Sequence, residues 1–101
     1  MATLHLDRLH CNTTEDNTGA DDAYIKVNGD QVWGPFAIND GENLDIGVSV
    51  NFGDQAAIEL WDEDSPDGDD ILGRHVVRAG SGGQLKFNND DSDYDLFYRT
   101  S

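Results

Sequence analysis

The sequence predicts an all-β protein, an eight-stranded antiparallel Greek-key β-sandwich built as one domain by residues 1–101. Apolar residues alternate with polar ones over residues 44–52, which is the period of two of a half-buried strand. Clusters of Gly, Asp and Asn recur about every ten residues, and no segment shows comparable helical spacing. Short strands separated by frequent turns favour an antiparallel sandwich or barrel.

Eight strands follow from these turn signals. The first begins almost at once with Leu4 and Leu6, the fourth is the alternating segment, and the sixth and seventh are separated by the glycine-rich turn at residues 80–83. We expect strands at about residues 3–11, 22–28, 31–38, 44–52, 57–61, 73–78, 84–87 and 94–99. Trp33 and Trp61 are expected in the core or on a sheet face.

The chain is strongly acidic but rich enough in apolar residues to fold. It has 21 acidic and 6 basic residues and a formal net charge of −15. This charge argues against nucleic acid as a partner and makes cations the natural counterparts. Leu, Ile, Val and Phe total 23 of the 101 residues, more than a disordered acidic chain carries.

Cysteine and histidine usage points away from disulfides and from transition-metal chemistry. Cys11 is the single cysteine, so we expect a small buried thiol. The three histidines, His5, His10 and His75, share no metal-ligand spacing and are read as strand or surface residues. The sequence shows no secretory leader and no apolar run long enough to span a bilayer, so we expect a soluble chain. An extracellular or cell-surface location is favoured over a cytoplasmic one.

The order of the strands predicts where the acidic residues gather. If consecutive strands are antiparallel, the connections after the first, third, fifth and seventh strands lie at one end of the sandwich. Only Asp30 and Asp54 belong to the connections at the other end. The first end collects fifteen acids: Glu15, Asp16, Asp21, Asp22, Asp40, Glu42, Asp62, Glu63, Asp64, Asp67, Asp69, Asp70, Asp90, Asp91 and Asp93. Such crowding of like charges favours a multivalent cation there.

The densest acidic stretch is Trp61-Asp62-Glu63-Asp64-Ser65-Pro66-Asp67-Gly68-Asp69-Asp70-Ile71-Leu72-Gly73. An EF-hand frame that starts at Asp62 fails, because Asp67 stands where glycine is needed and Gly73 stands where the bidentate glutamate is needed. The stretch at residues 88–92 is similar to βγ-crystallin calcium loops, but Asp93 replaces their closing serine.

Another template fits the stretch at both ends. It resembles the third calcium-binding loop of C2 domains, in which D-x-D is followed after five residues by D, two apolar residues and Gly. The matching residues here are Asp62, Asp64, Asp70, Ile71, Leu72 and Gly73, with Asp67 at an auxiliary position.

A second segment resembles the first C2 loop, D-x-x-G-x-S-D-P-Y-V-K. In this chain the segment spans residues 16–26, where Asp21 replaces Ser and Ala23 replaces Pro. The residues that match at identical spacing are Asp16, Gly19, Asp22, Tyr24 and Lys26. One strand precedes this loop, and the third loop joins the fifth and sixth strands, which is similar to the strand order of phospholipase C2 domains. The connection at residues 39–42 would be the second loop.

The resemblance implies a calcium-binding module with two or three ions. The implied ligands are Asp16, Asp22, Asp62, Asp64 and Asp70, with Asp67 as an auxiliary ligand; Asp21 and Asp69 are evenly balanced between ligand and solvated charge. We read Asp40, Asp90, Asp91 and Asp93 as solvating charges.

The loops depart from those of membrane-binding C2 domains, which usually carry apolar or basic tips, so we expect a structural or adhesive role in contact with another protein or domain. The chain is not expected to be an enzyme. The alternative is calcium-dependent binding to a phospholipid membrane, for which the acidic loops and only two lysines are unfavourable features. An enzyme-accessory or sugar-binding role is a third, weaker hypothesis.

Overall fold

The computed structural model describes residues 1–15, 19–64 and 68–101. It contains eight strands: β1 (Ala2–Thr13), β2 (Asp21–Val27), β3 (Asp30–Ile38), β4 (Asn43–Phe52), β5 (Gln55–Asp62), β6 (Asp70–Arg78), β7 (Gly82–Phe87) and β8 (Asp93–Thr100). The single helical element among the described residues is a 3₁₀ turn, η1 (Asn89–Asp91). None of the described residues forms a helix long and apolar enough to cross a bilayer.

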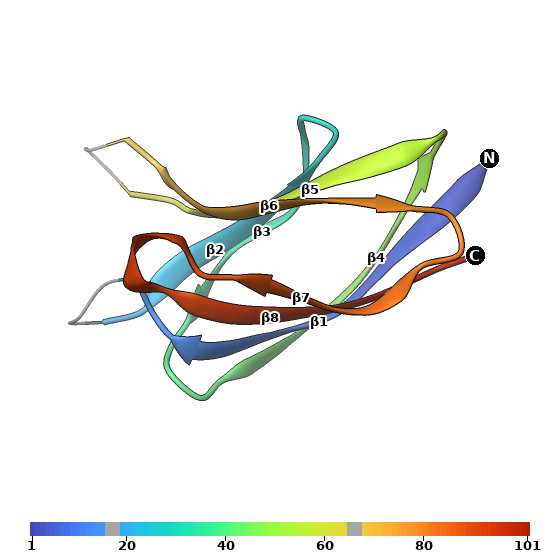
Figure 1. Ribbon diagram of the computed structural model, residues 1–101. Coiled ribbons are helices and arrows are strands. Elements are labelled where there is room, and N and C mark those ends of the chain that lie inside the picture. The colour runs from blue at the N-terminus through green and yellow to red at the C-terminus, as the bar shows by residue number, and fades with distance from the viewer. Residues whose placement is uncertain (16–18, 65–67) are drawn as a thin grey trace.

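The strands form two four-stranded antiparallel sheets, in the orders β4-β1-β8-β7 and β3-β2-β5-β6 (Figure 1). The predicted sandwich and its eight strands are therefore confirmed, with β6 beginning three residues earlier and β7 two residues earlier than expected. Asp70 belongs to β6 because it pairs with Asp62 across the β5–β6 ladder. One strand precedes the first acidic connection, and the third connection joins β5 to β6, as expected.

The core lies between the sheets and follows the strand pleat. Leu4 and Leu6 of β1, Ile58 and Leu60 of β5, and Leu96 of β8 are fully buried. Strand β4 shows the predicted alternation. Its inward residues Leu44 to Val50 are only half-buried because β4 is an edge strand, whereas Phe52 is buried. Trp33 is buried in the core and Trp61 lies half-buried on a sheet face, as expected.

The antiparallel registers confirm that the connections sort by parity. The connections β1–β2, β3–β4, β5–β6 and β7–β8 lie together at one end, which we call the acidic end. Both chain termini lie at the opposite end (Figure 1), where Thr3 and Ser101 exchange two backbone hydrogen bonds of 2.9 Å.

Candidate calcium site at the acidic end

The pleat of β2 and β5 decides which acids point into the sandwich. Ala23, Ile25 and Val27 face the core, so Asp21 shares their inward face and is fully buried. Asp62 continues the inward face of β5 and is 2% exposed. Two carboxylates are therefore buried at the acidic end of the core.

Two groups of three carboxylates converge at this end. One oxygen from each of Glu15, Asp21 and Asp62 lies within 4.8 Å of the other two, and the same holds for Glu15, Asp70 and Asp90. Two charges at this separation repel by about 3 to 4 kcal/mol at an effective dielectric near 20. Glu15 belongs to both groups, so they form one continuous patch of carboxylate oxygen that spans three of the four connections.

Hydrogen bonds hold Asp21 and Asp62 in place. The Tyr94 hydroxyl donates to Asp21 Oδ2 at 2.5 Å, and the Glu15 backbone N–H donates to the same oxygen at 2.8 Å. The Asp22 backbone N–H donates to Asp62 Oδ1 at 2.8 Å, which joins the first connection to the third. Burial, reinforced by the nearby Asp21 carboxylate, raises the pKa of Tyr94 far above its usual value, so its hydroxyl stays a proton donor.

The structure brings only some of the predicted ligands together. Asp62 and Asp70 each belong to one of the two groups, whereas Asp22 is exposed and Asp64 is half-buried and in neither group. Asp16 and Asp67 lie outside the described residues. The ligand set as a whole stays a prediction.

The two converging groups also include acidic residues that the C2 motif does not contain. Glu15 and Asp21 flank the first connection, and the inward parity of Asp21 with Ala23 and Ile25 was a readable signal for it. Asp90, which we read as a solvating charge, has an oxygen close to Glu15 and Asp70. Its backbone is left-handed, with φ of 56°, and sequence spacing carried no sign of that turn.

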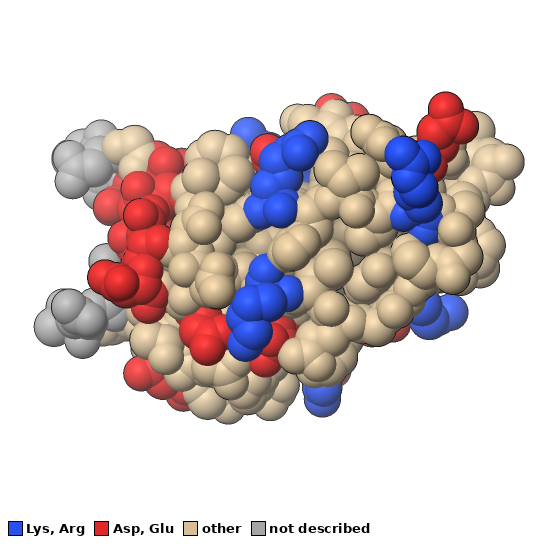
Figure 2. All heavy atoms as spheres, in the orientation of Figure 1, with Lys and Arg blue, Asp and Glu red and all other residues tan. Residues whose placement is uncertain are grey.

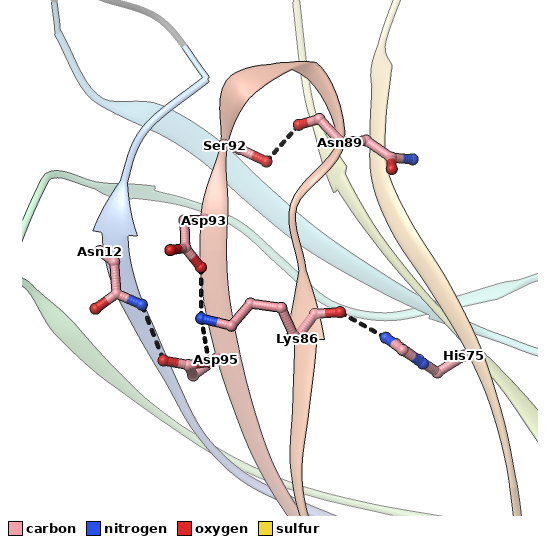
Figure 3. Close-up of polar contacts among 7 residues, drawn as sticks. All are labelled: Asn12, His75, Lys86, Asn89, Ser92, Asp93 and Asp95. Carbon is pink, nitrogen blue, oxygen red and sulfur yellow. Dashed lines mark hydrogen bonds and ion pairs between the residues drawn. The ribbon is translucent and has the colours of Figure 1, made fainter.

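Asp93 is engaged by a cation rather than only solvated. Lys86 Nζ lies 2.6 Å from Asp93 Oδ1 and 2.9 Å from Asp95 Oδ1, while Asn12 donates to Asp95 Oδ2 at 2.9 Å (Figure 3). Burial opposes ionisation of Asp95, but the hydrogen bonds from Lys86 and Asn12 outweigh it and lower its pKa.

The β7–β8 connection that follows Lys86 is also closed locally. Ser92 Oγ donates to the Asn89 carbonyl at 2.6 Å, and His75 Nε2 donates to the Lys86 carbonyl at 2.5 Å (Figure 3). The first bond closes a turn within the fourth connection, and the second joins β6 to β7, which belong to different sheets.

The second connection packs against the end of β1. The Gly41 N–H donates to the Cys11 carbonyl at 2.7 Å, and the Thr14 N–H donates to Asp40 Oδ1 at 2.8 Å. Asp40 thus has a structural hydrogen bond. Cys11 is fully buried, as expected, and burial raises the pKa of its thiol to about 11.

The donor chemistry of the site fits a hard cation. The two converging groups offer only carboxylate oxygens, which suit calcium, and include no thiolate or imidazole of the kind that zinc prefers. Figure 2 shows most of the visible acidic side chains gathered at the acidic end, whereas Lys and Arg are scattered over the rest of this face.

Comparison with solved structures places the fold. The chain aligns over its full length with 99% of a structure described as a C2 domain, at a TM-score of 0.63 and 18% identity. It also aligns with human GIVD cytosolic phospholipase A2, at a TM-score of 0.61 and 14% identity. That alignment covers 98% of this chain and 16% of the phospholipase. It also aligns with the C2A and C2B domains of Extended-Synaptotagmin 2, covering 99% of this chain and 39% of that chain, at a TM-score of 0.59 and 22% identity.

The sequence itself matches no protein-family model and no curated protein. The structural likeness extends over essentially the whole chain, and the part of the phospholipase that it covers is small. The protein has the C2 fold, the β-sandwich that its two loop motifs predicted.

Proposed function

We propose that the protein is a calcium-binding module whose acidic end holds two or three calcium ions. The observation that carries this proposal is the burial of Asp21 and Asp62 beside one another and beside Glu15. Buried charges are stable when they are paired or coordinate a metal. A calcium ion would compensate the repulsion and supply the six to eight oxygen contacts that the cation takes.

The ligand set that we propose combines the motif with the geometry. The motif contributes Asp16, Asp22, Asp62, Asp64, Asp67 and Asp70; the geometry adds Glu15, Asp21 and Asp90. Bound calcium would tie the first, third and fourth connections together, which supports a structural or adhesive role in contact with another protein or domain. The role is non-enzymatic.

The charge distribution supports a protein partner over an anionic membrane. All six Lys and Arg residues belong to strands, and none belongs to the connections at the acidic end. Two calcium ions would offset four of the fifteen excess negative charges. A membrane-docking module would need cationic or apolar loop tips at that end.

Thermal unfolding with calcium or with chelator tests the proposal. At calcium a hundredfold above its dissociation constant, one site adds about 2.7 kcal/mol. For a domain of this size, that raises the Tm by about 10 to 20 °C. Asp62→Asn should remove most of the shift, while Asp54→Asn, an equal change of charge at the opposite end, should leave it intact. Equal melting temperatures of the wild-type protein in calcium and in chelator would refute the proposal.

Co-sedimentation with phosphatidylserine vesicles separates the two roles. The proposed role predicts no calcium-dependent pelleting, and pelleting in calcium alone would favour the membrane role. We also propose an extracellular or cell-surface setting, which predicts an affinity in the range of 10⁻⁴ to 10⁻³ M, whereas a micromolar value would indicate a cytosolic sensor.

A further inference from the structure

Asp69 sits at the end of the β5–β6 connection, directly before Asp70. Its carboxylate accepts hydrogen bonds from two parts of the chain: β2, and the start of the β5–β6 connection. The Tyr24 hydroxyl donates to Asp69 Oδ2 at 2.5 Å, and the Asp64 backbone N–H donates to Asp69 Oδ1 at 3.1 Å. Both carboxylate oxygens are therefore used within the protein, and Asp69 belongs to neither of the two converging groups.

The position of the Tyr24 hydroxyl is set by the body of the sheet. Tyr24 is 5% exposed, and its ring stacks on Trp61 with centroids 6.1 Å apart and planes 10° apart. Strand β3 approaches the same residue at Gly34, where an added Cβ would lie 2.8 Å from Tyr24 Cα. Lys26 Nζ lies over the Trp61 ring, 4.9 Å from its centroid. The packing around the Tyr24 ring therefore holds its hydroxyl in one position.

We propose that Tyr24 and Asp69 are positioning residues that hold both ends of the β5–β6 connection and thereby pre-place Asp64 and Asp70 for calcium. The inference rests on the proposed function and assigns Asp69 a role other than ligand. Asp69 fixes Asp64 through its backbone N–H and fixes Asp70 as its chain neighbour. Ordering these residues before the ion arrives lowers the conformational entropy that binding must overcome.

We call the Tyr24–Asp69–Asp64 hydrogen bonds the latch. Calcium titration calorimetry on the whole chain tests its role. Tyr24→Phe removes one hydroxyl and keeps the ring on Trp61, so it should weaken calcium affinity about 3- to 10-fold with an unchanged number of ions. Asp69→Ala should give the same loss, and the double variant should lose no more than either single variant. Asp69→Asn keeps an acceptor oxygen and should be intermediate. Tyr98→Phe on β8 and Asp54→Asn at the opposite end are the matched controls.

A purely structural effect is separated by melting each variant in chelator. The latch predicts that the Tm without calcium changes little while the affinity falls. If Asp69→Ala lowers the number of bound ions, or weakens binding far more than Tyr24→Phe, Asp69 is a ligand and the proposal is wrong. Unchanged affinity in both variants also overturns it.

Hydrogen exchange of the metal-free protein keeps this test independent of the proposed function. The Asp64 amide should exchange faster in Tyr24→Phe and Asp69→Ala than in the wild-type protein, while the Asn28 amide should not change. A wild-type protein that binds no calcium refutes the proposed function, whereas an unchanged Asp64 exchange rate refutes the latch.

Discussion

The two ends of the sandwich differ in the groups that they bury and pair. At the opposite end, neutral groups satisfy one another: Asn28 and Ala57 exchange two hydrogen bonds of 2.9 Å, and Ser81 Oγ donates to the Arg78 carbonyl at 2.6 Å. At the acidic end, two carboxylates are buried in the same layer as the apolar core. The opposite end is closed by neutral hydrogen bonds, whereas the acidic end buries negative charge that the proposed calcium would balance. The comparison shows that the excess charge of the chain is a local property.

Tyr94→Phe should produce the largest effect, and it acts at the acidic end. The variant removes the hydroxyl that donates to buried Asp21, and hydrogen bonds to charged groups contribute about 1.5 to 3 kcal/mol. We expect a loss of about 2 kcal/mol in chelator, measured by urea unfolding, and a smaller loss in calcium because the ion would also compensate Asp21. Tyr98→Phe is the control, and equal losses in the two tyrosine variants would contradict this account of the acidic end.

Asn28→Ala should produce an intermediate effect at the opposite end. It removes the side-chain acceptor of the Ala57 N–H and places alanine in a left-handed conformation, at φ of 51°. We expect a loss of about 1 kcal/mol, or somewhat more, by urea unfolding. The loss should be the same in calcium and in chelator. Asn28→Gly, which relieves the backbone cost, should recover part of it, and a calcium-dependent loss would break the distinction between the ends.

Titration of Cys11 should have the smallest effect near neutral pH, because it acts only at alkaline pH. The folded protein holds the pKa of this thiol at about 11 against an ordinary value of 9.0, so the neutral thiol favours the folded state. That contribution is complete below pH 9.0 and is lost as the pH rises towards 11. Urea unfolding between these values should show a steeper decline for the wild-type protein than for Cys11→Ala. Parallel profiles would show that the thiol is not linked to folding.

The sequence was sufficient for the strands because alternation and turn residues are local signals. Leu44 to Phe52 alternates in the structure as it does in the chain, and Gly and Asp clusters mark most of the strand ends. Strand β6 begins earlier than the sequence predicts, because pairing with Asp62 overrides the low strand propensity of Asp70. Parity correctly gathered the acidic connections at one end.

The internal geometry of the site was only partly readable. Strand pleat separates Asp21, which points inward, from Asp22, which is exposed, and this distinction follows from Ala23 and Ile25. The approach of Asp90 to Glu15 depends on a left-handed turn. The bond from Tyr24 to Asp69 joins residues 45 positions apart, and no local pattern encodes such a contact.

A calcium titration followed by two-dimensional amide NMR tests the central claim most directly, because it reads both ends of the molecule at once. The account predicts large, saturable shifts at Thr14, Glu15, Asp22 and Asp64, and little change at Asn28, Ala57 and Ser81. Magnesium at the same concentration should produce smaller shifts, since it dehydrates reluctantly and demands a stricter geometry. Shifts of equal size at both ends, or none at the acidic end, would contradict the account.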